Sequence, residues 1–142
     1  LGRGIYYPIA LEAALKMKEV AYVHAEGMPG GFLKHGTLAM IDDDISSIVF
    51  VPPKEKKDLY QSTIHSIEEL RARSGFVLGI HFKEQGKNHD LFNEELILPN
   101  VPPLIAPLIQ LVIGQLFAYF TATSLKRNVD KPRSLAKSVT VG

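Results

Sequence analysis

Two short apolar runs, at residues 46–51 and 76–82, flank a segment with helical periodicity, and this arrangement restricts the fold more than any other feature. The runs, SSIVFV and FVLGIHF, are typical of buried strands. Residues 54–74 lie between them, and Gly75 follows as a helix stop signal. The apolar residues that recur there at helical spacing are Leu59, Ile64, Ile67 and Leu70. A strand, a helix and a second strand in this order predict an α/β domain with a mainly parallel sheet.

A first helix is predicted over residues 8–24, because a proline suits the first helical turn. The residues that recur along one of its faces are Ala10, Ala14, Met17 and Ala21. Such small side chains predict a close approach of the helix to a sheet beneath it. The preceding residues 1–4 (LGRG) are typical of the end of a strand, so we expect these 142 residues to be a piece of a longer protein.

Residues 104–126 form the longest apolar segment, LIAPLIQLVIGQLFAYFTATSLK, and follow a short strand predicted at 96–98. The length of this segment permits a membrane span. Pro107, Gln110 and Gly114 interrupt it, however, and favour a helix buried against protein. We therefore predict no membrane partner.

Composition limits the function further. The formal net charge of +1 gives no reason to expect nucleic acid as the main partner. The chain contains no cysteine, which excludes thiolate chemistry and is compatible with a cytoplasmic location. Its five histidines show no metal-ligand spacing, and no glycine-rich phosphate loop is present, so we expect neither a metal nor a cofactor.

The first helix carries Glu12, Lys16 and Glu19 at positions i, i+4 and i+7, opposite the stripe of small residues. This spacing has two interpretations. It predicts either salt bridges on a solvent-facing surface or a carboxylate that moves protons while a neighbouring cation holds it.

Two further residues could carry chemistry. His35 lies in a glycine-framed loop, GGFLKHG, and histidine titrates near neutral pH. Lys137 lies in the C-terminal segment PRSLAKSVTVG, where desolvation could make its amine nucleophilic toward a carbonyl. Each residue could equally be an exposed bystander.

Four stretches resemble the family of glucosamine-6-phosphate synthases, the glutamine–fructose-6-phosphate amidotransferases. They are LGRG (1–4), ALEAALKMKEVAYVHAEG (10–27), LKHG (33–36) and VDKPRSLAKSVTV (129–141). The resemblance implies a flavodoxin-like three-layer α/β/α sandwich, the second of two sugar isomerase (SIS) subdomains. It implies an SIS domain over residues 1–126 and a tail over 127–142 that carries the active-site lysine.

The resemblance also implies roles for particular residues. Lys137 matches the lysine that forms a Schiff base with fructose 6-phosphate, and Glu19 matches the glutamate that moves a proton between C1 and C2. His35 matches a histidine that assists sugar ring opening from the neighbouring subunit. Lys16, Glu12 and Ala136 match supporting or substrate-binding residues.

The implied whole protein makes glucosamine 6-phosphate with glutamine as nitrogen donor. It would be a homodimer with a shared active site, and it would contain a glutaminase domain and a first SIS subdomain. The phosphate-binding loops belong to that first subdomain, so we expect these 142 residues alone to be inactive. Phe32 and Thr37 depart from the family pattern GELKHGP on either side of His35. Two alternatives therefore stay open: a glutaminase-free deaminase or deglycase of a phosphorylated amino sugar, and a non-catalytic module that binds a sugar phosphate.

Overall fold

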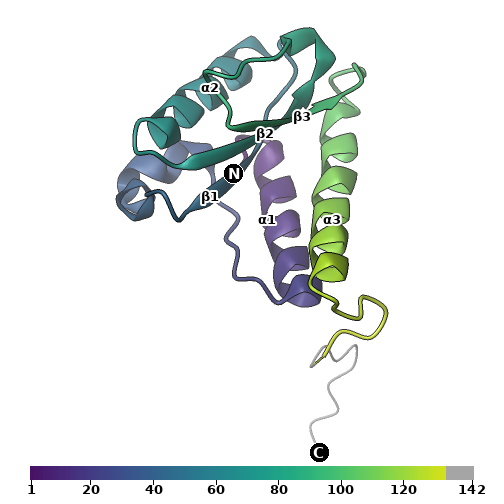
Figure 1. Ribbon diagram of the computed structural model, residues 1–142. Helices are drawn as coiled ribbons and strands as arrows, with labels where there is room; N and C mark the ends of the chain where they lie inside the picture. Colours follow the sequence, from purple (N-terminus) through teal and green to yellow (C-terminus); the bar gives the residue numbers. More distant parts are fainter. Residues whose placement is uncertain (134–142) are drawn as a thin grey trace, which may run out of the picture.

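A three-stranded parallel sheet forms the centre of the computed structural model, which describes residues 1–133 (Figure 1). Its strands, in spatial order, are β1 (Ser46–Phe50), β2 (Phe76–Phe82) and β3 (Glu94–Leu98). In register, Ser46 lies opposite Phe76, and Leu78 lies opposite Glu94. The predicted parallel pairing is confirmed, and β3 begins two residues before the predicted strand at 96–98.

Two helices cover one face of the sheet. These are α1 (Tyr6–Lys16) and α3 (Ala106–Ser124), which lie side by side in Figure 1. The buried residues of this layer form one apolar cluster: Tyr6, Ile9, Ala10, Phe50, Ile80, Phe82, Leu98 and Ala106. Gly114 allows the close approach, because a Cβ there would lie 2.9 Å from the Cβ of Ala13.

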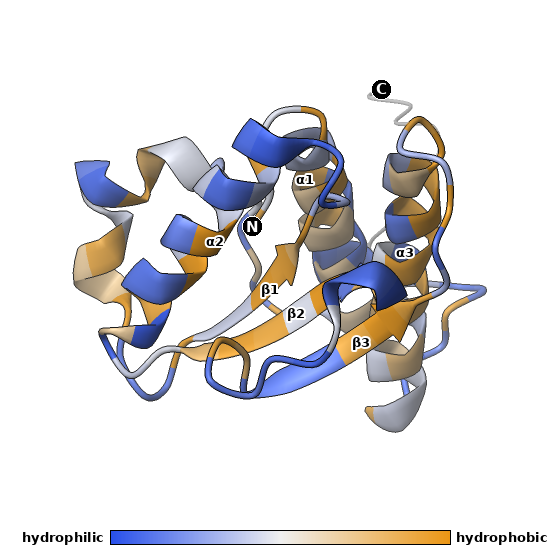
Figure 2. Ribbon diagram, turned by 90° about the horizontal axis from the view of Figure 1, so that it is seen from above, coloured by the Kyte–Doolittle hydropathy of each residue, from blue (hydrophilic) through white to orange (hydrophobic). Residues whose placement is uncertain are grey.

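The opposite face is covered by α2 (Lys57–Arg71) and by two 3₁₀ helices, η2 (Gly30–His35) and η3 (Thr37–Met40). A second apolar cluster fills this layer: Leu33, Leu38, Val49, Val51, Ile67, Leu70, Val77 and Phe92. Phe50 faces one cluster while Val49 and Val51 face the other, as the alternation of side chains along a strand requires. Seen from above, the sheet lies between the two helical layers (Figure 2), and the predicted three-layer α/β/α arrangement is confirmed.

Helix boundaries differ from the predictions for local reasons. The first helix begins at Tyr6, so Pro8 still lies within its first turn, where a missing backbone N–H has no consequence. At the end of α2, Ser74 rather than Gly75 takes the left-handed backbone conformation, with φ of 61°. Gly75 follows, and a Cβ there would lie 2.6 Å from Cγ2 of Ile41. A further 3₁₀ turn, η4 (Lys83–Gln85), follows β2.

The long apolar segment is a helix that packs against α1 and the sheet along one side, but only a third of its most apolar window is buried, less than the predicted burial against protein. By length and composition α3 could cross a membrane, with a mean hydropathy of 1.3. Its buried residues lie along one side and include Gln110, which is fully buried. The Gln110 side-chain amide donates to the backbone carbonyls of Val51 and Ile80, both at 2.9 Å. This polar residue therefore fixes the helix to β2 and to the residue that follows β1.

Candidate functional site

The first helix does not end as an ordinary α-helix. It continues into a π-helical turn, η1 (Met17–Ala21), which carries Glu19. The Met17 carbonyl accepts the N–H of Tyr22, five residues on, and that of Val23 at 3.3 Å. Tyr22 closes the turn in the left-handed conformation, with φ of 56°. Single π-helical turns are frequent at functional sites, and a non-glycine residue with this backbone is strained.

Glu12, Lys16 and Glu19 lie together at this end of the helix. The Lys16 ammonium donates to Oε2 of Glu19 at 2.6 Å and lies 3.7 Å from Oε1 of Glu12. The hydrogen bond to Glu19 raises the pKa of Lys16, burial opposes that rise, and the charge of Glu12 adds to it. Lys16 is therefore a fixed cation that holds the Glu19 carboxylate in one orientation.

These three side chains lie at a partly covered surface. Their exposed fractions are 31% for Glu12, 32% for Lys16 and 24% for Glu19. Gln115 of α3 lies 3.5 Å from Glu12 through its side-chain amide. Glu19 combines a carboxylate, a directing cation and partial exclusion of water, which are the properties that a proton-transferring group needs.

The chain that leaves α3 returns to this same end of α1 (Figure 1). Lys126 takes a left-handed conformation, and the Arg127 N–H donates to the Ala122 carbonyl at 2.8 Å, which closes the helix with a Schellman motif. The Asn128 side chain then accepts the backbone N–H groups of residues 130 and 131 at 3.1 and 3.0 Å. These two turns direct the following residues toward Tyr22.

His35 lies elsewhere. It ends η2 on the side of the sheet that α2 covers, where Lys34 pairs with Glu69 of α2 at 2.9 Å. His35 is exposed, and its ring lies 5.6 Å from that of Phe32, which is 63% exposed. Within residues 1–133, no hydrogen bond or ion pair joins His35 to Glu12, Lys16 or Glu19. The structure thus brings together three of the predicted residues and leaves His35 apart.

Lys137 and Ala136 lie outside the described residues, and so does most of the predicted tail. In the described part of the chain, no group of three or more histidine, aspartate or glutamate side chains is arranged to hold a metal ion.

One hollow of the described structure has none of the predicted site residues in its lining. It has a volume of about 610 Å³ and lies along α1 and β1. Its apolar lining includes Ala14, Met17, Ile48, Leu78 and Phe117. Because it contains no Glu12, Lys16, Glu19 or His35, we do not assign it to the chemistry of Glu19.

Sequence reasoning missed Tyr22 and the two arginines around it. The guanidinium carbons of Arg127 and Arg133 lie 5.4 and 4.4 Å from the centre of the Tyr22 ring. No spacing along the sequence could have indicated this contact, because it joins residues more than 100 positions apart.

Comparison with known proteins places these observations in a family. The SIS domain family matches residues 1–124. The glutamine–fructose-6-phosphate aminotransferase (isomerizing) of Methanococcus maripaludis is 44% identical over 141 residues, which cover 99% of this chain and 22% of that protein. The Thermus thermophilus enzyme of the same name is also 44% identical, with 23% of its length covered.

A solved structure agrees with this. The C-terminal domain of glucosamine-fructose-6-phosphate aminotransferase from Francisella tularensis superimposes with a TM-score of 0.81 at 36% identity, covering 92% of this chain and 36% of that one. The chain thus spans less than a quarter of the length of the two curated relatives named above. It belongs to the family of SIS domains.

Proposed function

We propose that this chain is the part of a glutamine–fructose-6-phosphate aminotransferase that isomerises the sugar phosphate. The observation that carries the proposal is the carboxylate of Glu19, held by Lys16 at 2.6 Å on a π-helical turn beside the returning C-terminal segment. The high identity to aminotransferases over 99% of the chain supports the same reaction. The whole protein would be a cytoplasmic homodimer that takes nitrogen from glutamine.

In the proposed mechanism, the Lys137 amine condenses with the C2 ketone of fructose 6-phosphate, releasing water and forming an imine. Ammonia from glutamine then adds at C2 and displaces the Lys137 amine, which leaves a free imine at C2 and regenerates the lysine. The Glu19 carboxylate takes a proton from C1 of this imine and returns it at C2, while the C1 hydroxyl loses a proton and the nitrogen gains one, giving the amino aldehyde. Glu19 suits this task because the hydrogen bond from the Lys16 ammonium fixes the orientation of its carboxylate.

Chain length supports a meeting of Lys137 and Glu19. The Arg133 N–H donates to the Tyr22 hydroxyl, and Tyr22 is three residues beyond Glu19. Lys137 is four residues beyond Arg133. Four residues of fully extended chain span at most about 14 Å. Its amine therefore has the reach to join the same site.

His35 would act in the site of a second copy. Its exposure, and its position on the layer opposite α1, support a role between subunits rather than beside Glu19 of its own chain. A shared site of this kind requires a homodimer for activity. Phosphate binding would come from parts of the whole protein outside these residues, so the isolated chain would be inactive.

Trapping of the imine tests the proposal. The whole protein is incubated with fructose 6-phosphate and borohydride, and the adduct is located by mass spectrometry. We expect it on Lys137, its loss in Lys137→Arg, and its retention in Lys131→Arg, a lysine of the same segment. Glu19→Gln should keep the adduct but lower proton exchange at C1 in deuterated water by at least a hundredfold, the usual contribution of a general base.

The alternatives predict different results. A non-catalytic sugar-phosphate module would bind fructose 6-phosphate without an adduct or proton exchange. A deaminase or deglycase would convert a phosphorylated amino sugar without glutamine. Either result would overturn the proposed reaction.

A further inference from the structure

Tyr22 contacts the segment that leaves α3 in two independent ways. Its hydroxyl oxygen accepts the backbone N–H of Arg133 at 2.6 Å. Its ring lies beneath the guanidinium group of Arg133, whose carbon is 4.4 Å from the ring centre, and near that of Arg127 at 5.4 Å. Both distances are within the range of attractive cation–π contacts. One half-buried side chain therefore holds two points of this segment.

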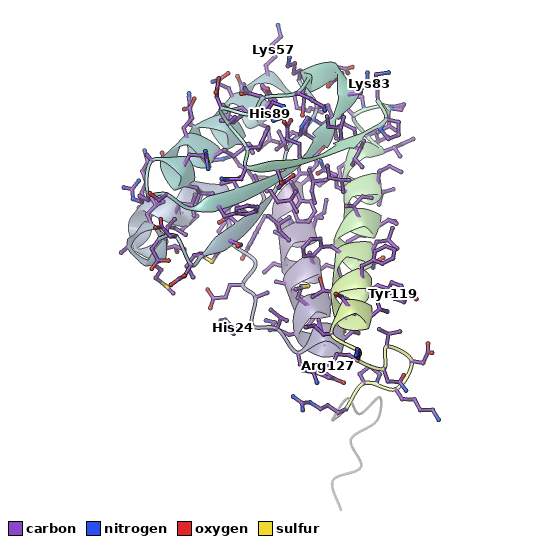
Figure 3. All side chains as sticks on the ribbon, in the orientation of Figure 1. His24, Lys57, Lys83, His89, Tyr119 and Arg127 are labelled. Carbon is purple, nitrogen blue, oxygen red and sulfur yellow. The ribbon has the colours of Figure 1, made fainter. Side chains whose placement is uncertain are left out.

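The backbone on each side is shaped for this contact. On the helix side, the π-helical turn and the left-handed conformation of Tyr22 set the direction of its side chain. On the other side, the Schellman motif at Lys126 and the turn around Asn128 reverse the chain and bring Arg133 back. Figure 3 shows Arg127 near the lower ends of α1 and α3, where the two helices finish together.

We propose that Tyr22 is a positioning residue that fastens residues 127–133 to the turn carrying Glu19. The consequence of this contact, that the fastened segment presents Lys137 to the site, rests on the proposed function. The contact itself is a property of described residues. Without it, the segment would keep its two turns but lose its attachment to α1.

Limited proteolysis tests the contact without reference to any reaction. Trypsin must extract the Arg133 side chain to cleave after it, so the Tyr22 contact protects this bond. In the 142-residue chain, Tyr22→Ala should speed cleavage after Arg133 by on the order of tenfold or more, because it removes the hydrogen bond and both cation–π contacts. Tyr22→Phe retains the ring and should show a smaller increase.

The matched control is Tyr119→Ala, an exposed tyrosine of α3 that points away from the molecule (Figure 3). It should leave cleavage after Arg133 unchanged. Circular dichroism and thermal unfolding show whether each variant folds, and Tyr22→Phe keeps the proposal testable if Tyr22→Ala does not fold. Unchanged cleavage after Arg133 in a folded Tyr22→Ala chain would overturn the inference.

Activity of the whole protein tests the consequence. If Tyr22 positions the lysine, Tyr22→Ala should lower both kcat and the rate of borohydride trapping at Lys137 by about tenfold or more. KM for fructose 6-phosphate should change less than twofold, and Tyr22→Phe should recover most of kcat. Equal trapping rates in wild type and Tyr22→Ala would overturn the positioning role. Absence of trapping in the wild type, with the proteolysis difference intact, would instead refute the proposed function and leave the Tyr22 contact standing.

Discussion

In a polypeptide made to begin at Leu1, the amino group of this residue makes the stability depend on pH in a predictable direction. Leu1 pairs with β1: its amino group donates to the Ile48 carbonyl, and its own carbonyl accepts the Phe50 N–H at 3.0 Å. Burial lowers the pKa of this amino group from 8.0 to about 5. In a chain that starts at Leu1, folding therefore removes a proton from the amine over much of the neutral range.

The sign follows from proton linkage. Between pH 8 and pH 5 the unfolded chain binds more protons at Leu1 than the folded chain, so the free energy of unfolding falls as the pH falls. Each pH unit in this interval costs about 1.4 kcal/mol. The loss is therefore roughly 1.4 kcal/mol at pH 7 and at most about 4 kcal/mol at pH 5, below which it stays constant.

An N-acetylated chain isolates this effect, because acetylation removes the charge and leaves every side chain unchanged. Urea unfolding of the free and acetylated chains should be measured from pH 5 to pH 8.5. All side chains are the same in both forms, so their contributions cancel in the difference between the two free energies of unfolding. The free energy of unfolding of the acetylated chain minus that of the free chain should be smallest at pH 8.5 and should grow by several kcal/mol toward pH 5. A difference that does not vary with pH would refute the reasoning.

Two substitutions test the packing that supports the site. Gln110→Met should lower the free energy of unfolding by about 2 kcal/mol. Two hydrogen bonds are lost, and the buried Val51 carbonyl loses its donor. Removal of the unpaired Gln110 side-chain oxygen offsets part of this cost. Gln115→Met on the exposed side of α3 is the control, and an equal effect of the two changes would contradict the role of the buried amide. Gly79→Ala should cost about 2 kcal/mol by overpacking, because its Cβ would lie 2.4 Å from the Phe92 ring. Phe92→Leu in the same chain should recover part of that loss, and additive effects of the two changes in denaturant unfolding would exclude the steric explanation.

Strands β1 and β2 could be predicted because mostly apolar runs, SSIVFV and FVLGIHF, contain them. Strand β2 has the predicted bounds, but β3 begins at Glu94, where the sequence is acidic. Glu95 is 5% exposed in its side chain and pairs with the fully buried His81 at 2.8 Å. Apolar periodicity cannot predict that a carboxylate such as Glu95 is buried, because its burial depends on a hydrogen bond to a residue of another strand.

The helical stripe of Glu12, Lys16 and Glu19 could be predicted because spacing alone places these residues on one face. Spacing could not decide between a solvent-facing salt bridge and a held carboxylate, since that depends on what covers the face. Both ion pairs are present, and the partial burial beside α3 distinguishes the arrangement from a fully solvated one. The π-helical turn was beyond prediction, because no local sequence preference indicates the i to i+5 hydrogen bond of Met17.

The strain at the end of α1 and the contacts of the returning segment explain one another. A left-handed conformation at a tyrosine costs on the order of 1–2 kcal/mol. The hydrogen bond from Arg133 and the two cation–π contacts each contribute about 0.5–1 kcal/mol, which is enough to offset that cost. These contacts exist only while Tyr22 is in this conformation and the segment is in place. The turn that holds Glu19 and residues 127–133 therefore stabilise each other, although they lie more than 100 positions apart in the sequence.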